Sequence, residues 1–189
     1  RGIGFAQLGY GTLLMKFKKL NTLFIVFFIS SSSFAKELIS ITAVGDIMMG
    51  TTYPENSLPQ NDEKNMFEEA VPWIKASDVR LGNFEGTFFD GEPQPDGKMG
   101  GPNRWLFRTP PSYASHLVDA GFNVMGLANN HIRDFGSAGI ASTKETLKAN
   151  DIKYSSKSGE VAVFEVEETP VAVIAVDYYP GKRSIVDSV

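Results

Sequence analysis

An apolar run in the second half of the chain ends abruptly in polar side chains that can do chemistry. Residues 122–127, Phe-Asn-Val-Met-Gly-Leu, are followed after one alanine by Asn129, Asn130 and His131. In an open α/β sheet, the carboxyl ends of the strands deliver such side chains to a crevice at the sheet edge. Amide oxygens can bind cations, and an imidazole can ligate a metal ion or transfer a proton. We therefore predict a functional site at this strand end.

Two earlier apolar runs also end in a carboxylate. One run, residues 39–46, ends at Asp46, and another ends with Asn83, Phe84 and Glu85. Asn83 and Glu85 alternate with Phe84, so both should project from one side of an extended segment. If the three runs meet at one sheet edge, the donors there are Asp46, Asn83, Glu85, Asn130 and His131. Oxygen and imidazole donors suit divalent zinc, manganese or iron, and the chain has no cysteine to offer a thiolate.

Each of these residues also has a purely structural interpretation. Asp46 could cap a turn after Gly45, and His131 could close a turn by bonding backbone carbonyls. Asn129 and Asn130 both tolerate left-handed backbone geometry, so one of them should serve the turn, and Asn130 is the better ligand candidate. We favour functional roles because polar residues end all three runs, and we take His131 and Asp46 as the catalytic candidates.

The N-terminal region has the pattern of an export signal. Met15 is the first methionine, and it precedes three lysines, an apolar run over residues 20–29 and a small-residue stretch that ends at Ala35. The apolar run is about half of the roughly 20 residues that a membrane span needs, so we expect a cleaved signal peptide over residues 15–35 and not a permanent anchor. Residues 1–14 are expected to be a non-native extension. The predicted location is the periplasm, the cell surface or the extracellular space.

Removal of the predicted signal leaves an acidic chain. Residues 1–35 carry four Lys or Arg and no acidic residue, so the remaining 154 residues have 14 basic against 22 acidic residues, a net charge of −8. A nucleic-acid partner normally requires a basic face, so we expect no nucleic-acid binding. A chain of this length can bury one core, and residues 36–189 are predicted to form one domain.

The order of the predicted elements is that of an α/β protein. Apolar residues at helical spacing predict a helix over residues 65–75, in which Pro72 should cause a kink or a restart. A second helix, over residues 109–120, is framed by prolines at its start and by Gly121 at its end. Ser137 is expected to cap a third helix. With strands between the helices, this βαβα order predicts a parallel sheet.

The later part of the chain changes to an antiparallel pattern. Two β-branched runs, residues 161–166 and 171–176, flank a turn at residues 167–170, which predicts a hairpin. Residues 90–102 hold four glycines and three prolines in thirteen positions and should form a long loop of the kind that often covers a site. We therefore predict an α/β fold with mixed sheets.

Three arginines are candidates for binding an anionic substrate. Arg104 and Arg108 follow the long loop, and guanidinium groups can hold carboxylates bidentately. The alternative is that these two residues form an ordinary loop rim. Arg133 is the third candidate, although it could instead pair with its neighbour Asp134. His116 lies inside a predicted helix without clustered polar neighbours, and we expect it to be structural.

Three sequence motifs occur in a fixed order along the chain. They are Gly45-Asp-Ile-Met-Met-Gly50, Asn83-Phe-Glu-Gly86 and Leu127-Ala-Asn-Asn-His-Ile-Arg-Asp-Phe-Gly136. Together they resemble the CapA family of poly-γ-glutamate capsule biosynthesis proteins, over a stretch from about Ile39 to Tyr154. That family looks like a relative of the calcineurin-type metallophosphoesterases. The resemblance implies a layered α/β/β/α sandwich with mixed sheets and a metal site at the strand ends, formed by Asp46, Asn83 or Glu85, and Asn130 with His131.

The chain departs from the metallophosphoesterase pattern in two places. Those enzymes open with Asp-x-His, whereas this chain reads Asp46-Ile-Met48, and a thioether is a poor ligand for a hard divalent ion. They also carry histidines further downstream, and His131 is the last histidine here. We therefore expect an N-terminal fragment, truncated at its C-terminus, whose metal site is incomplete.

The resemblance implies an exported protein that acts on an anionic cell-envelope polymer of the poly-γ-glutamate class, beside a membrane polymer synthase or export complex. As a metal-dependent hydrolase, phosphoesterase or amide hydrolase, it would hold one or two Mn, Fe or Zn ions that polarise a phosphoryl or amide oxygen. His131 would then ligate an ion or protonate the leaving group. As a non-catalytic accessory protein, it would bind the polymer in the same pocket. A secreted α/β domain whose polar strand ends are merely turns is the remaining alternative.

Overall fold

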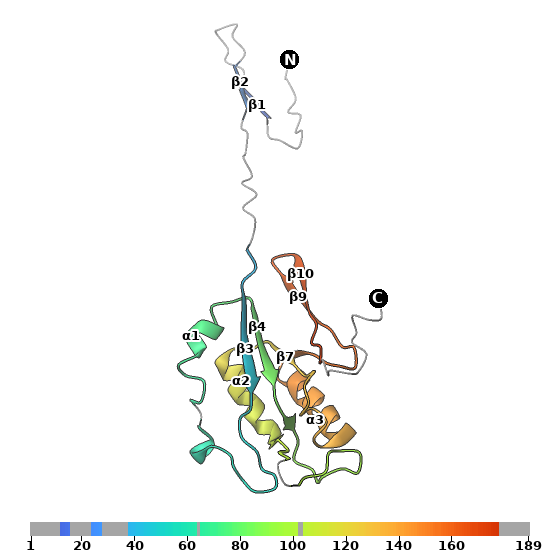
Figure 1. Cartoon of the computed structure of the whole chain (residues 1–189). Helices are drawn as coiled ribbons and strands as arrows, with labels where there is room; N and C mark the ends of the chain where they lie inside the picture. Colours follow the sequence, from blue (N-terminus) through green and yellow to red (C-terminus); the bar gives the residue numbers. More distant parts are fainter. Residues whose placement is uncertain (1–11, 16–23, 28–37, 64, 102–103, 178–189) are drawn as a thin grey trace. The chain divides into compact units, whose positions relative to one another are not determined.

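The computed structural model divides the chain into two compact units, Arg1–Glu37 and Leu38–Val189. The described residues are 12–15, 24–27, 38–63, 65–101 and 104–177. In the first unit, strands β1 (Thr12–Met15) and β2 (Phe24–Phe27) pair antiparallel (Figure 1). Most of the predicted signal peptide and of the predicted extension before it lies outside the described residues, so both stay predictions.

A parallel sheet with the strand order β3-β4-β7-β8 organises the second unit (Figure 1). Its strands are β3 (Ile41–Ile47), β4 (Val79–Phe84), β7 (Val124–Gly126) and β8 (Lys153–Ser155). Every neighbouring pair runs parallel, so the carboxyl ends of all these strands lie at the same edge. The predicted α/β class with a parallel sheet is confirmed. Strand β8 was not predicted, because three residues are too few to show a periodic pattern.

Proline determines where the first helix of this unit begins. Residues 65–70 form turns, and helix α1 covers only Val71–Ile74, with Pro72 in its first turn. A proline is tolerated there because the first N–H groups of a helix have no partner within the helix. The predicted helix over residues 65–75 is therefore too long, and of the two predicted effects of Pro72, a kink or a restart, the structure shows a helix start.

The other two helices follow their predicted spans more closely. Helix α2 (Ala114–Ala120) continues from a short 3-10 helix, η2 (Pro111–Tyr113), and ends at Gly121 with a left-handed φ of 91°. Helix α3 (Gly136–Ala149) ends at Asn150. No helix that the structure describes combines the length and the apolar character that a membrane crossing requires.

The N-terminus of helix α3 is capped by a side chain from a distant loop. Its N-cap position makes no side-chain hydrogen bond, so the predicted cap by Ser137 is wrong. Instead, the Ser137 N–H donates to Asp96 Oδ2 over 2.8 Å, and Asp96 comes from the Gly/Pro-rich loop. This hydrogen bond from the Ser137 backbone holds the pKa of the Asp96 carboxyl below its usual value. A contact between residues 41 positions apart cannot be read from local spacing.

The two faces of the parallel sheet are covered by different layers. On one face, Phe84, Met125 and Leu127 share a core with Leu117 of α2 and Leu147 of α3. On the other face lies the antiparallel hairpin of β9 (Ala162–Val166) and β10 (Thr169–Val173), whose side chains pack against the second core. The predicted hairpin is thus confirmed. The described residues form three layers of helices, parallel sheet and hairpin, and the fourth layer of the expected sandwich stays a prediction.

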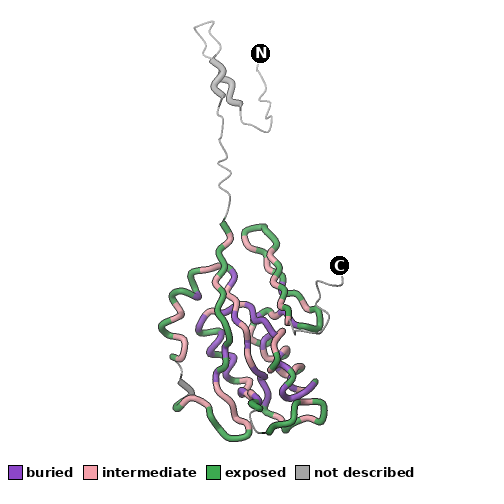
Figure 2. The backbone as a smooth tube through the Cα atoms, in the orientation of Figure 1, coloured by how far each residue is buried: buried purple, intermediate pink, exposed green. Residues whose placement is uncertain are grey.

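Strand β3 is the exposed edge of the parallel sheet. Figure 2 shows buried residues in the middle of the second unit and mostly exposed backbone along β3. Ile41 is 60% exposed, and only Ile47 at the end of β3 is buried. The carboxyl end of β3, where Asp46 stands, is therefore accessible beside a rigid sheet.

A small parallel ladder closes the long loop next to the end of β4. Strand β5 (Thr87–Phe88) pairs with β6 (Arg108–Thr109), so the residues between them return to the sheet edge. Apart from an isolated bridge between Gly101 and Arg104, the described part of this loop has no strand or helix. The predicted long loop is confirmed, and the ladder brings it beside the Asn-Asn-His segment.

Candidate functional site

Asn83 joins the ends of two neighbouring strands. Asp46 of β3 and Asn83 of β4 are register partners, and the Asn83 Nδ2 donates to Asp46 Oδ1 over 2.7 Å. The same Nδ2 donates to Glu85 Oε2 over 3.0 Å. Two carboxylates that lie 39 positions apart in the sequence thus converge on one amide, as the strand-end pattern predicted.

Asn129 connects the third strand end to this pair. Its Nδ2 donates to Asn83 Oδ1 at 2.9 Å and to the Phe84 carbonyl at 2.8 Å. Its Oδ1 accepts hydrogen bonds from the backbone N–H groups of His131 and Ile132, each at 3.0 Å. One asparagine of the pair therefore serves the turn, as predicted. Asn130 is exposed, and its side chain has no hydrogen bond to any residue that the structure describes.

The imidazole of His131 stands between two carboxylates. Its Nδ1 lies 2.7 Å from Asp134 Oδ2, and its Nε2 lies 3.6 Å from Glu85 Oε1. The ring of Phe107 stacks on it, with the centroids 4.2 Å apart. Since the His131 side chain is only 14% exposed, its surroundings fix the ring, with Nε2 directed toward Glu85.

Asp134 is a fully buried carboxylate that sequence reasoning did not place in the site. Its Oδ1 lies 2.7 Å from Lys98 Nζ, and its Oδ2 also accepts the Phe107 N–H at 2.8 Å. The alternative pairing of Asp134 with Arg133 is wrong, because Lys98 and His131 take its two oxygens while Arg133 is exposed. The i, i+3 spacing of His131 and Asp134 was the signal that could have revealed the pair.

Burial raises the pKa of the Glu85 carboxyl above its usual value, and the charge of Asp46 raises it further. His131 and the hydrogen bond from Asn83 oppose this rise. Glu85 therefore keeps a proton to higher pH than an exposed glutamate does. A carboxyl with that property beside an imidazole is suited to general acid-base chemistry.

The predicted metal donors are only partly assembled. Among the residues that the structure describes, no group of three or more His, Asp or Glu side chains is close enough to hold an ion. Two donors, His131 Nε2 and Glu85 Oε1, face each other at 3.6 Å. Two ligands bound at about 2.0 Å to one tetrahedral ion are about 3.3 Å apart, so the spacing of this pair fits shared coordination. Asp46 joins them only through the Asn83 amide.

The arginines predicted to bind substrate are in different situations. Arg108 donates to Thr52 through Nε and Nη2 and to the Gly91 carbonyl through Nη1, at 2.8 to 3.1 Å. Its guanidinium also lies over the rings of Tyr53 and Phe135. Arg108 thus ties the loop to the irregular segment that follows β3, whereas Arg104 and Arg133 are exposed and free to meet a ligand. Substrate binding by all three stays a prediction.

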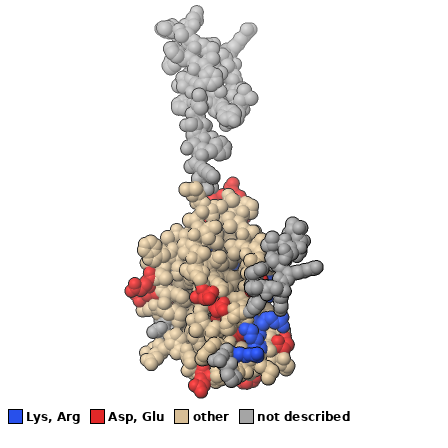
Figure 3. All heavy atoms as spheres, viewed as in Figure 1, with Lys and Arg blue, Asp and Glu red and all other residues tan. Residues whose placement is uncertain are grey.

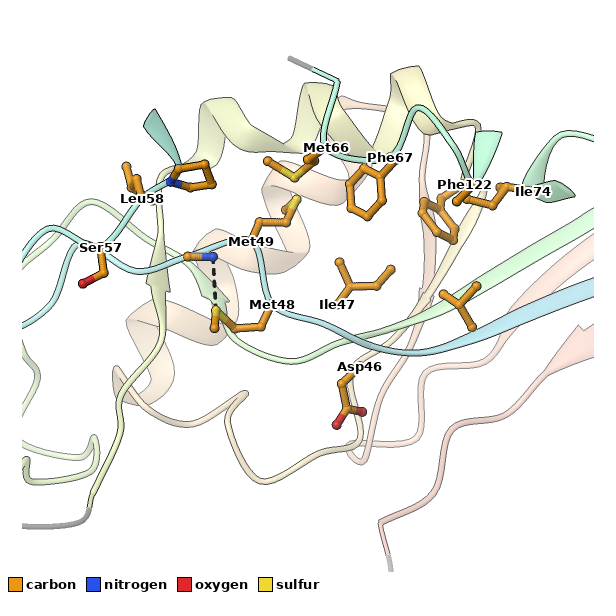
Figure 4. A pocket seen from close by; sticks show the side chains of 14 residues that line it. Asp46, Ile47, Met48, Met49, Ser57, Leu58, Met66, Phe67, Ile74 and Phe122 are labelled. Atoms are coloured by element: carbon orange, nitrogen blue, oxygen red, sulfur yellow. Dashed lines mark hydrogen bonds between the residues drawn. The ribbon is translucent and has the colours of Figure 1, made fainter. Parts of the chain in front are cut away.

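An apolar cavity of about 670 Å³ lies beside Asp46 (Figure 4). Its lining is mostly apolar and includes Met49, Leu58, Met66, Phe67 and Phe122. Met48 turns its sulfur toward the Gly50 N–H at 3.1 Å, as the dashed line in Figure 4 shows. Asp46 belongs to the lining and lies below Ile47 in the view (Figure 4). The cavity therefore gives Asp46 an apolar neighbour on one side and the polar cluster on the other.

The remaining surface and the second histidine do not add to this cluster. On the face seen in Figure 3, uncharged atoms predominate and the acidic side chains stand in separate places. His116 is buried in α2, where it meets the Tyr113 ring edge-on at 4.8 Å. This environment agrees with the structural role predicted for His116.

Comparison with known proteins identifies the family. Residues 40–187 match the family described as bacterial capsule synthesis protein PGA_cap. The chain is 32% identical over 118 residues to capsule biosynthesis protein CapA of Bacillus anthracis, which covers 62% of this chain and 28% of that protein. It is 32% identical over 113 residues to PGA biosynthesis protein CapA of Bacillus subtilis strain 168, covering 59% and 28% of the two chains.

A third relative is a protein without an assigned role. The chain is 33% identical over 118 residues to uncharacterized protein y4sH of Sinorhizobium fredii, covering 60% of this chain and 23% of that protein. The chain spans about a quarter of the length of the curated relatives that it matches. The matched region holds all the strand ends of the cluster, and the predicted resemblance is confirmed. The chain therefore belongs to the PGA_cap family of bacterial capsule synthesis proteins.

Proposed function

We propose that this chain takes part in the synthesis or export of an anionic capsule polymer of the poly-γ-glutamate class, and that the cluster at the sheet edge is its reactive centre. The family and the names of the two CapA relatives support the polymer class. The observation that carries the reactive centre is the position of His131, whose Nε2 faces Glu85 Oε1 at 3.6 Å while Asp134 holds the opposite side of the ring.

An anionic polymer cannot approach this cluster without a compensating charge. Asp46 and Glu85 both accept hydrogen bonds from Asn83, so negative charge accumulates within a few ångströms of the site. Like charges at such distances repel, and the carboxylates of the polymer would add to that repulsion. A cation bound at the site would cancel this repulsion between carboxylates. This electrostatic requirement supports the predicted divalent ion at the site.

In this proposal His131 Nε2 and Glu85 would hold a Mn, Fe or Zn ion, with Asp46, Asn83 and Asn130 as the further predicted donors. When bound, the ion supplies positive charge that polarises an amide or phosphoryl oxygen of the substrate. Glu85 is suited to hold or release a proton because burial raises the pKa of its carboxyl. The exposed Arg104 and Arg133 would bind polymer carboxylates beside the centre.

We propose amide hydrolysis in preference to phosphate ester hydrolysis as the reaction. Met48 stands where a metallophosphoesterase has the histidine of its Asp-x-His motif, and its sulfur is turned to the Gly50 N–H. A non-catalytic polymer-binding role is the alternative, because carboxylates and an ion could also grip the polymer without cleaving it. The proposed place of action is outside the cytoplasm, beside a membrane synthase or export complex, and it rests on the signal pattern of residues 15–35.

The test compares Glu85→Gln with Glu165→Gln in the full chain. Glu165 is an exposed glutamate on the hairpin, so it matches the chemical change outside the site. We expect Glu85→Gln to lower manganese or zinc binding and cleavage of poly-γ-glutamate by at least about tenfold, which corresponds to about 1.4 kcal/mol, and Glu165→Gln to change neither. Cleavage that both variants retain would remove Glu85 from the reaction. Polymer binding without cleavage by the wild-type chain would instead favour the accessory role.

Export can be tested separately from chemistry. A fusion of residues 15–35 to a reporter enzyme that is active only outside the cytoplasm should give activity. Replacement of Lys16, Lys18 and Lys19 by Glu, which inverts the charge of the predicted signal, should reduce it. Equal reporter activity with and without residues 15–35 would contradict the proposed location.

A further inference from the structure

We propose that Asp134 is a positioning residue that fixes His131 as the tautomer with hydrogen on Nδ1, so that the lone pair of Nε2 faces Glu85. This inference rests on the proposed role of His131 in the reactive centre and goes beyond it, because it assigns the proton to one ring nitrogen. The residues that carry the inference lie in the Asn-Asn-His segment and in the Gly/Pro-rich loop.

Both side-chain oxygens of Asp134 face hydrogen-bond donors. Its side chain is completely buried, and a buried carboxylate is tolerated only when charged or polar partners compensate it. Lys98 Nζ lies 2.7 Å from Oδ1, and the Phe107 N–H donates to Oδ2 at 2.8 Å. An ammonium faces one oxygen of Asp134 and a backbone N–H faces the other, so both oxygens act as acceptors.

The tautomer of His131 follows from the acceptor role of Asp134. Oδ2 of Asp134, which accepts the Phe107 N–H, also lies 2.7 Å from His131 Nδ1. Nδ1 must therefore carry hydrogen, and in the neutral ring Nε2 then has none. The stacked Phe107 ring, 4.2 Å away, prevents the imidazole from turning out of this plane. The pairing thus presents Nε2 to the cluster as a base or ligand atom.

The Gly/Pro-rich loop that supplies Lys98 is attached to the segment that contains Asp134. The Lys98 N–H donates to the Asp134 carbonyl at 3.1 Å, and the neighbouring Asp96 caps helix α3 at Ser137. The loop is therefore attached at Asp134 and at Ser137, through backbone and side-chain contacts. Without the loop, Asp134 would lose its only ion pair with a lysine or arginine among the described residues. Lys98 thus positions His131 indirectly, through Asp134.

The experiment is nitrogen-15 NMR of the imidazole rings in the full chain, at a pH of about 8.5, where a histidine of ordinary pKa is neutral. The chain has two histidines, so the loss of signals in His131→Ala assigns the ring. We expect hydrogen on Nδ1 of His131 in the wild type. Asp134→Ala removes the carboxylate oxygen beside Nδ1, so the tautomer should shift toward hydrogen on Nε2, the position that a free neutral imidazole prefers.

The matched control is Asp177→Ala, which changes an aspartate that pairs with Lys157 at 3.1 Å elsewhere in the chain. It should leave the His131 tautomer unchanged. Hydrogen on Nε2 in the wild type overturns the inference, whether or not Asp134→Ala folds. An unchanged tautomer in a natively folded Asp134→Ala variant overturns it too. Because neither result depends on turnover, the inference can fail while the proposed function stands, or hold while the cleavage assay fails.

Discussion

The side-chain Nδ2 of Asn83 donates hydrogen bonds to two carboxylates, Asp46 Oδ1 at 2.7 Å and Glu85 Oε2 at 3.0 Å. This amide separates two carboxylates that would otherwise repel each other at the ends of β3 and β4. Its oxygen is held in turn by the Asn129 Nδ2 at 2.9 Å, which orients the amide with its nitrogen toward the acids. Asn83 is therefore the residue on which the electrostatic balance of the cluster depends.

Asn83→Asp should destabilise the chain strongly near neutral pH. The substitution replaces a donor by a third carboxylate, so the free energy of unfolding should fall by about 1–3 kcal/mol. The loss should shrink as the pH falls toward 4, because the carboxylates then take up protons. Urea denaturation at both pH values measures it. Asn56→Asp, at an exposed residue, is the control, and equal effects of the two substitutions would contradict the proposed balance.

Glu160 should make stability depend on pH in the acid range. Hydrogen bonds from Lys144 and then Ser156 lower the pKa of Glu160 to about 2. Because the pKa of Glu160 is lower in the folded state, the ionised carboxyl stabilises the fold at pH values above the unfolded-state pKa of about 4.5. This stabilisation is lost as the pH falls through the folded-state pKa of about 2. Since the side chain is 38% exposed, solvent screening limits the contribution to about 1 kcal/mol.

The test of Glu160 is the difference in unfolding free energy between wild type and Glu160→Gln, measured from pH 7 to pH 2. The difference should be largest above pH about 4.5 and should vanish toward pH about 2. Glu165→Gln, at an exposed residue on the hairpin, should show no such trend. A difference that stays constant over the whole range would show that packing, and not charge, accounts for the effect of Glu160→Gln.

Gly136→Ala should weaken the junction between the long loop and helix α3. Gly136 has a left-handed φ of 63°, and a Cβ there would collide with the Asp96 carboxylate and lie 3.0 Å from Gly97 N. We expect a loss of about 1–3 kcal/mol in thermal or urea unfolding. Gly101→Ala is the control, because a Cβ at Gly101 meets nothing within 4 Å. A loss of the same size at both positions would speak against the loop junction.

Arg108→Lys separates a structural role from substrate binding. A lysine cannot reproduce the three bonds to Thr52 and Gly91 or the guanidinium stacking, so stability should fall by about 1–2 kcal/mol. Arg104→Lys, at an exposed arginine, should leave stability unchanged. Calorimetric unfolding together with polymer binding decides between the roles. Weaker polymer binding by Arg108→Lys at unchanged stability would support the predicted substrate contact instead.

Much of the candidate site could be predicted from the sequence because strand periodicity acts locally. An apolar run that ends in Asp46 or in Asn83 and Glu85 specifies both a strand and what stands at its end. Parallel strands in a sheet then bring those ends to one edge without further information. The same reasoning predicted that one of Asn129 and Asn130 would serve the turn.

Asp134 and Lys98 were missed for a physical reason. Lys98 lies in a Gly/Pro-rich loop that has no periodicity, and its contact with Asp134 spans 36 positions. Nothing in the local pattern distinguishes a buried aspartate with a lysine partner from an exposed one next to Arg133. The cap of α3 by Asp96 was missed in the same way, because a carboxylate from a distant loop replaced the local candidate Ser137.

The sequence by itself determined the α/β class, the hairpin, the family and the residues at three strand ends, since each depends on the order and spacing of side chains along a short stretch. Only the tertiary structure decided which of those residues touch, that His131 lies between Glu85 and Asp134, and that a loop lysine compensates the buried charge. Those relationships depend on how the loop over residues 90–101 folds back on the sheet edge, and many loop paths are compatible with the same local pattern.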